Sequence, residues 1–273
     1  MNFSGVIDMH IHTGPDIRQR RLDDIELAQA AIRLGVRAVV IKSHVMPTTG
    51  RAAIAEKVCP GVRVFGGIVL NPHVGGINPA AVEAAIKMGG KIVWLPTSFS
   101  VAQRRAEGKN DGVVTVIDNK VVPALVDICK LIAQHNLVLA TGHLSPEEIF
   151  VVVTEAQRQG VQKIVITHPE IGTVSMSIAD QRALAKSGVY FERVYAQPLG
   201  GGKYKSNLIT NLEAIEKVGY QSTIIATDSG QVENPPWNES IVEYITFLEK
   251  QGISQAELAV MTKTTPAKLL DLD

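Results

Sequence analysis

Eight short runs of aliphatic and β-branched residues recur along the chain, and a helical pattern follows each of them. The runs are GVIDMHIH (5–12), RAVVIKSH (37–44), VRVFGGIVL (62–70), KIVWLPTS (91–98), LVLATGH (137–143), KIVITHP (163–169), VYFERVY (189–195) and STIIATDSG (222–230). Apolar runs of this length are typical of strands buried on both faces. We therefore expect an α/β protein with a parallel sheet, and eight units are the number that closes a (β/α)8 TIM barrel.

The segments between the runs are amphipathic, and several open on Ser or Asn and close on Gly, as capped helices do. An open, doubly wound sheet is the main alternative. No glycine-rich phosphate loop follows the first run, so we do not expect a nucleotide-binding version of that fold. The chain has no linker rich in Pro, Gly or Ser and no low-complexity segment. We expect residues 1–273 to form a single domain.

One interval is longer than the others. Residues 99–121, which follow the fourth run, contain VVTVI and a turn-like Asp-Asn pair. This pattern predicts a small hairpin inserted after strand four. It is a lid over the barrel mouth, a surface excursion, or a contact between copies in a homo-oligomer.

Composition excludes several classes of protein. The formal net charge is zero and the sequence pI is about 7.1, which argues against nucleic-acid binding. No apolar run approaches the roughly 20 residues of a membrane span. The N-terminus lacks a basic head followed by a long apolar stretch, so we expect no signal peptide. Cys59 and Cys129 lie in unrelated segments, as expected of reduced thiols in a cytoplasmic protein.

The first run ends in two histidines, His10 and His12. Side chains alternate along a strand, so strict alternation places Asp8, His10 and His12 on one face and the three apolar residues between them on the other. The two imidazoles are either a preformed pair of metal ligands or polar groups at an exposed strand end.

Other polar residues end the later runs. They are His44, with Lys42 two residues before it, His143, His168 and Asp228, while Glu192 lies within the seventh run. In a parallel barrel all strand C-termini lie on one face, where active sites are built. Nitrogen and carboxylate donors without a thiolate suit a divalent ion such as Zn²⁺. His73 is expected to be a loop histidine, and Trp94 a packing residue.

The ordered set resembles the amidohydrolase superfamily: HxH after strand one, His after strands five and six, and Asp after strand eight. The resemblance covers essentially the full chain, and segments such as GVIDMHIHTGPD, VVIKSH and LATGHLSPEE are similar to an uncharacterised branch. It implies that the metal ligands come from His10, His12, His143, His168 and Asp228.

The chain departs from that pattern at strand four. Binuclear members of the superfamily place a bridging carboxylated Lys or a Glu there, whereas this chain has KIVWLPTS. We therefore favour one bound ion. A second ion held through Lys42, His44 or Glu192 is the alternative, with Lys42 carboxylated as one route to it.

These features predict a metal-dependent hydrolase that uses an activated water on a C–N or C–O bond of a small-molecule amide, lactam, lactone or ester. Asp228 would carry the proton and His168 would stabilise the oxyanion. Lys42, His44 and Glu192 would contact substrate. The alternatives are a phosphoesterase of the polymerase-and-histidinol-phosphatase type and a barrel that binds a metal or a small molecule without catalysis.

Overall fold

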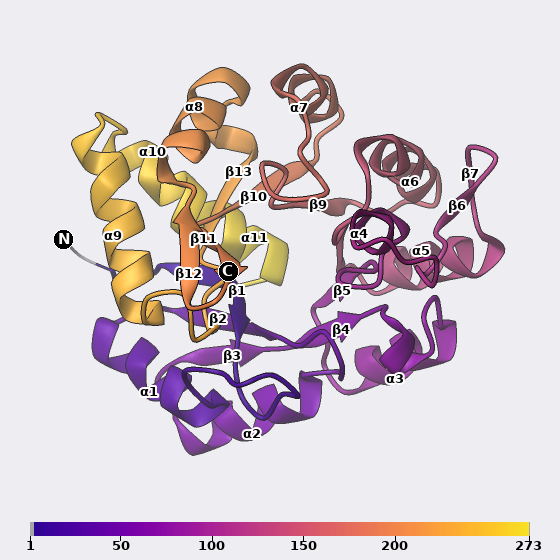
Figure 1. Cartoon of the computed structure of the whole chain (residues 1–273). Helices are drawn as coiled ribbons and strands as arrows, with labels where there is room; N and C mark the ends of the chain where they lie inside the picture. Colours follow the sequence, from indigo (N-terminus) through magenta and orange to yellow (C-terminus); the bar gives the residue numbers. More distant parts are fainter. Residues whose placement is uncertain (1–2, 273) are drawn as a thin grey trace.

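The eight predicted strands are present in the computed structural model, which describes residues 3–272, and helices surround them (Figure 1). The third strand is interrupted at Gly66 and is therefore named in two parts. In spatial order the strands are β1 (Ile7–His12), β2 (Ala38–Lys42), β3 (Arg63–Phe65) with β4 (Gly67–Val69), β5 (Ile92–Trp94), β8 (Val138–Ala140), β9 (Lys163–Thr167), β10 (Tyr190–Val194) and β13 (Thr223–Ala226). All of the paired neighbours are parallel. The fold is an α/β barrel, as the sequence predicts.

Two seams join the strands into a ring. The first is the interruption between β3 and β4, where Thr48 connects β2 to β4 through hydrogen bonds. The Thr48 hydroxyl donates to the carbonyl of Ile41 and accepts from the backbone N–H of Gly67. A Cβ at Gly66 would lie 2.6 Å from the Thr48 backbone, so only glycine permits this approach.

The second seam lies between β1 and β13. The backbone N–H of Asp228 donates to the carbonyl of His10 (2.9 Å), and that of His12 donates to the carbonyl of Ser229 (2.8 Å). Gly230 has φ 119°, and a Cβ there would lie 1.8 Å from the carbonyl oxygen of His12. A larger residue would force the two strand ends apart. The first and last strands therefore meet at the residues that carry the predicted site.

The predicted alternation along β1 is wrong at Asp8. Its register against β2 shifts between Asp8 and Ile11, which marks a β-bulge. Before the bulge Met9 packs inside the barrel, and after it Ile11 packs outside against the helices. Asp8 pairs with the outward-facing Val39, and its carboxylate accepts a hydrogen bond from Trp237 outside the barrel. Asp8 therefore does not share a face with His10 and His12.

Helices follow the strands in the predicted rhythm. The eight outer helices are α1 (Asp24–Leu34), α2 (Thr49–Val58), α3 (Pro79–Lys87), α5 (Pro123–Gln134), α6 (Pro146–Arg158), α7 (Ile178–Ala185), α8 (Leu208–Val218) and α9 (Trp237–Lys250). Asp23 and Ser145 begin α1 and α6 with capping boxes, which satisfy the first backbone N–H groups. Short 3₁₀ turns lie at Pro72–Val74 and Tyr220–Ser222.

The C-terminal segment packs against the base of the barrel. It comprises α10 (Gln255–Ala259), a π-helical turn (Val260–Thr264) and α11 (Thr265–Leu270). Leu269 and Leu270 join the interior cluster that includes Ile7, Ile92 and Ile224 from the strands. Two further clusters fill the space between strands and helices. With its base packed in this way, the barrel places its polar residues at the opposite end.

The predicted hairpin in residues 99–121 is confirmed, as β6 (Val116–Ile117) and β7 (Lys120–Val121), with Asp118 and Asn119 at positive φ in the turn. It packs beside α6 rather than over the mouth (Figure 1). The short helix α4 (Val101–Ala106) precedes it and lies nearer the site. A second hairpin, β11 (Ala196–Gly200) with β12 (Lys203–Ser206), has no counterpart in the sequence-based prediction.

In the part of the chain that the structure describes, no helix combines the length and the apolar character that crossing a bilayer requires.

We predict that Asp8→Ala lowers the free energy of unfolding by about 2–4 kcal/mol, because several buried donors lose their acceptor. The Asp8 carboxylate accepts from the backbone N–H groups of His10 and Thr227, from the Thr227 hydroxyl and from Trp237 Nε1. Asp8→Asn, which keeps one acceptor oxygen, should lose less. Urea unfolding measures both, and an Ala variant within 0.5 kcal/mol of the wild type, roughly the scatter of surface substitutions, would contradict this role.

Candidate functional site

Three side chains from the two ends of the chain meet at the β1–β13 seam. Asp228 Oδ1 lies 3.2 Å from His10 Nε2 and 3.1 Å from His12 Nε2. One ligand atom from each of the three residues lies within 4.8 Å of the others. The bulge in β1 turns both imidazoles inward, and the backbone bonds across the seam fix the carboxylate opposite them. We refer to His10, His12 and Asp228 as the triad.

His10 is held from both sides of its ring. Glu192 Oε1 lies 2.7 Å from His10 Nδ1, and Lys42 Nζ lies 3.0 Å from His10 Nε2. Glu192 is 2 % exposed and does not line the cavity, so its carboxylate serves His10 rather than a ligand in the cavity. When Nδ1 donates to Glu192, Nε2 of the neutral ring is left with a lone pair directed at the triad centre.

The site favours a positive charge at the triad. Burial opposes the protonated His10 ring, but Asp228 and Glu192 outweigh burial and raise the pKa of His10 to about 9. Burial also works against the Asp228 carboxylate, yet contacts with His10 and His12 hold its pKa well below the usual range. Burial, with the charge of Arg20, lowers the pKa of His12 to about 3, so this ring is neutral.

The five histidines predicted at strand ends form a closed ring of neighbours. The ring centroids are 5.3 Å apart for His10 and His12, 4.8 Å for His12 and His44, 6.1 Å for His44 and His143, 4.8 Å for His143 and His168, and 6.1 Å for His168 and His10. Burial lowers the pKa of His168 to about 4, and those of His44 and His143 fall well below 6.5. Four of the five rings are therefore neutral at pH 7, each with one N–H donor and one nitrogen lone pair.

A hydrogen-bond network fixes the orientation of His44. Its Nδ1 lies 2.7 Å from the Thr97 hydroxyl, and the Asn71 amide donates to that hydroxyl and to the His44 carbonyl. Thr97 follows β5, the fourth predicted strand, where the sequence resemblance led us to look for a bridging anion. Thr97 carries no negative charge, and its hydroxyl contacts His44.

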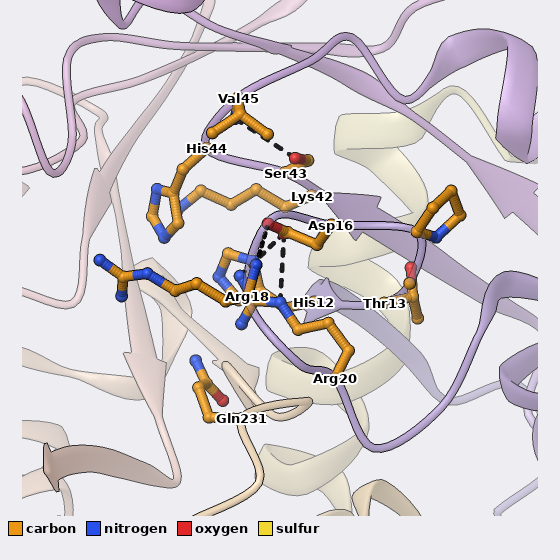
Figure 2. Close-up of polar contacts among 12 residues, drawn as sticks. His12, Thr13, Asp16, Arg18, Arg20, Lys42, Ser43, His44, Val45 and Gln231 are labelled. Atoms are coloured by element: carbon orange, nitrogen blue, oxygen red, sulfur yellow. Dashed lines mark hydrogen bonds and ion pairs between the residues drawn. The ribbon is translucent and has the colours of Figure 1, made fainter.

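A cavity of about 340 Å³ lies above the triad. Its floor includes His12, Lys42 and Asp228. Its wall includes Gln103 of α4, Glu107 at the C-terminal end of that helix, and Gln197 and Pro198 of β11. Figure 2 shows Arg18 and Arg20 beside His12, His44 and Lys42 at this opening. A cavity of this size accommodates a small molecule.

Two residues of the site have strained backbones. His168 has φ 29° and Asp228 has φ 51°, a region that side chains other than glycine rarely adopt. His168 directly follows β9, and Asp228 is the second residue after β13, so the positive φ turns the chain sharply as it leaves the barrel. Backbone strain of this kind is concentrated at functional sites, where the surrounding structure maintains it.

The triad fits a divalent metal ion. Two imidazole nitrogens and one carboxylate oxygen are a donor set that zinc and similar ions accept, and three protein ligands leave a coordination position open. Glu192 supplies the carboxylate partner that metal-bound histidines characteristically have. His12 Nδ1 is buried without a hydrogen-bond partner in the structure. His143 and His168 lie along the histidine ring, outside the triad itself.

Sequence reasoning missed several residues of this site. Arg18 and Arg20 lie in the β1–α1 loop, Gln231 follows Gly230, and Asn71 orients His44 through Thr97. The basic run RQRR, which begins six residues after the second histidine, was the available signal for the arginines. The roles of Asn71 and Gln231 depend on contacts between distant loops and have no local signature.

Comparison with known proteins agrees with the fold. The chain resembles a structure from Pseudomonas putida described as a candidate 2-pyrone-4,6-dicarboxylic acid hydrolase, with TM-score 0.67, 17% identity and coverage of 100% and 99% of the two chains. A zinc-bound amidohydrolase from Burkholderia multivorans gives TM-score 0.65, 13% identity and coverage of 98% and 99%. A 2,6-dihydroxybenzoate decarboxylase in complex with 2,6-dihydroxybenzoate gives TM-score 0.62, 10% identity and coverage of 98% and 100%.

These likenesses establish that the fold is that of the amidohydrolase superfamily, as the sequence predicts. No curated protein is detectably similar to the chain in sequence. Residues 5–192 match the model of a family of unknown function, DUF6282, and the chain belongs to that family.

Proposed function

We propose that this protein is a metal-dependent hydrolase of small molecules, with one divalent ion, zinc by preference, held by His10, His12 and Asp228. The observation that carries the proposal is the triad itself: three convergent ligand atoms at the floor of a cavity in an amidohydrolase fold. When bound, the ion would supply a water activated for attack at neutral pH.

Asp228 is proposed as the proton acceptor. Its Oδ1 makes the contacts to His10, His12 and Gln231, whereas Oδ2 has no partner among the described residues. The two histidines hold its pKa well below the usual range, so at neutral pH the carboxylate is in the ionised form that a proton acceptor requires. Asp228 would then return that proton to the leaving group of a C–N or C–O bond.

The remaining residues are proposed to bind and polarise substrate. His168 lies beside His10 and would donate to the developing oxyanion. His143, which lies next to His168, would either share that role or act as a ligand of the ion. Lys42 and His44 line the cavity and would orient substrate. Glu192, predicted from the sequence to contact substrate, is reassigned here to orienting His10.

The comparisons support an enzyme but do not select the reaction, since the similar structures include a decarboxylase as well as hydrolases. A panel of small esters, lactones, lactams and amides, with p-nitrophenyl phosphate and 2,6-dihydroxybenzoate alongside, tests the choice. Metal-dependent cleavage of a carboxylic ester, lactone or amide is expected. Turnover confined to the phosphate ester would indicate the phosphoesterase alternative, and turnover confined to dihydroxybenzoate a decarboxylase.

We also propose a cytoplasmic location. Cys59 and Cys129 are both free and buried, as the sequence predicts of reduced thiols. Burial also raises the pKa of the Cys129 thiol to about 12, so it is unreactive.

We predict one tightly bound ion per chain in protein purified without chelator. Two dications about 3.5–4 Å apart repel strongly unless an anion bridges them, and the end of the fourth strand offers only the uncharged Trp94, Leu95, Pro96 and Thr97. Elemental analysis should give about one equivalent for the wild type and for His73→Ala, a histidine outside the triad, and far less for His12→Ala. Two equivalents of metal per chain, together with the added mass of a carboxyl group on Lys42, would contradict the prediction of a single ion.

We predict that Asp228→Asn abolishes turnover on any substrate found in the panel. The carboxamide keeps an oxygen donor for the ion but cannot accept a proton at neutral pH, so much of the metal should remain bound. Rate and metal content are measured on the same samples. Full activity would exclude Asp228 as the proton acceptor, and loss of all metal would show that its charge is essential for binding.

We predict that Glu192→Gln weakens metal affinity by about 10–100-fold, the usual effect of removing a carboxylate that orients a ligating histidine. The amide can still accept from His10 Nδ1 through its oxygen but has lost the charge. Competition with a chromophoric chelator measures the affinity. Glu155→Gln, at a half-buried residue on α6 outside the site, is the matched control and should bind metal as the wild type does.

A further inference from the structure

The cavity above the triad contains a charged side chain that the fold leaves unpaired. Arg18 lines the cavity from the β1–α1 loop, and no described residue forms a hydrogen bond or an ion pair with its guanidinium. In Figure 2 the side chain extends away from the Asp16–Arg20 pair, and no dashed line reaches its guanidinium. An unpaired arginine in a concave site is the side chain best suited to bind an anionic group of a ligand.

The other charges that line the cavity are compensated. Arg20 donates through Nε and Nη2 to Asp16, and both of these side chains are almost fully buried. Glu107 pairs with Lys109 and with Arg104, and Arg104 also pairs with Asp111, so these four charges cancel and Glu107 does not neutralise Arg18. Lys42 and the Asp228 carboxylate at the floor both contact His10. The mouth therefore has an excess of one positive charge, which belongs to Arg18.

The loop that carries Arg18 is held in place by Arg51 of α2. Its Nη2 donates to the carbonyls of Thr13 and Gly14, and its Nη1 donates to that of Pro15. Asp24 at the start of α1 pairs with the same guanidinium. The loop backbone is thus fixed before any ligand arrives, so binding an anion there requires little reorganisation.

We propose that the substrate carries a carboxylate remote from its scissile bond and that Arg18 binds this carboxylate at the mouth of the cavity. This inference rests on the proposed function, because it places the scissile bond at the triad on the cavity floor. A carboxylate, with a single charge, matches the single uncompensated charge of Arg18, whereas a phosphate monoester carries a charge closer to two. Its two oxygens also match the paired N–H groups of a guanidinium.

Three probes that share one aromatic body test the assignment: benzoate, the neutral benzamide and phenyl phosphate. Their affinities for the metal-loaded full chain are measured by calorimetry. The wild type should bind benzoate more tightly than benzamide or phenyl phosphate. Arg18→Gln should weaken the affinity for benzoate by about tenfold or more, as expected for loss of a charge-assisted hydrogen bond, and leave the affinity for benzamide unchanged.

Two further variants separate charge from geometry and from general effects. Arg18→Lys keeps the charge but not the planar fork, so its loss of benzoate affinity should be smaller than that of Arg18→Gln. Arg33→Gln removes an exposed arginine from the last turn of α1, away from the cavity, and should bind all three probes as the wild type does.

Several outcomes would overturn the assignment. If benzoate binds no better than benzamide, or if its affinity is unchanged in Arg18→Gln, Arg18 is excluded as the carboxylate site. If phenyl phosphate binds most tightly and its affinity is lost in Arg18→Gln, the group that Arg18 binds is a phosphate. The metal content of the same samples separates this inference from the proposed function. Arg18-dependent benzoate binding by protein that takes up no ion would support the carboxylate site and contradict the metal-dependent hydrolase.

Discussion

The site depends on the seam where the first strand meets the last. Backbone hydrogen bonds between Asp228 and His10 and between His12 and Ser229 bring residues more than two hundred positions apart into contact. The bulge in β1 then turns two successive histidines of the HxH pattern inward, while Asp8 faces outward and anchors the seam to Trp237. Gly230 makes the close approach sterically feasible. A one-residue change of register here would point the imidazoles away from the carboxylate.

Around this seam the barrel gathers ionisable groups and removes them from water. Burial alone would neutralise them all, and it does so for His12 and His168, whose pKa values fall to about 3 and 4. His10 is the exception, because Asp228 and Glu192 together outweigh burial. The result is one position that attracts positive charge among neutral imidazoles. A divalent cation satisfies that position better than a proton does, since it also uses the lone pair of His12.

The loops outside the strands determine what can reach the triad. Arg51 fixes the β1–α1 loop from the neighbouring α2, and that loop presents Arg18 and Arg20 to the cavity. The β11 strand supplies Gln197 and Pro198 to the opposite wall. The barrel thus holds the proposed chemistry at its floor, while segments of irregular sequence shape the mouth. This separation is typical of barrel enzymes, whose chemistry lies at strand ends and whose specificity lies in loops.

The sequence by itself determined the eight-stranded α/β barrel, the hairpin in 99–121 and a set of polar residues at strand ends that includes the triad, because apolar periodicity and strand-end position are local properties of a chain. It did not determine the bulge that separates Asp8 from His10 and His12, since a bulge is set by pairing with β2. The contact of Glu192 with His10, the unpaired charge of Arg18 and the second hairpin were likewise decided by tertiary structure. Each depends on which distant side chains lie opposite, and the physical reason is that burial and pairing are properties of the assembled barrel and not of any one segment.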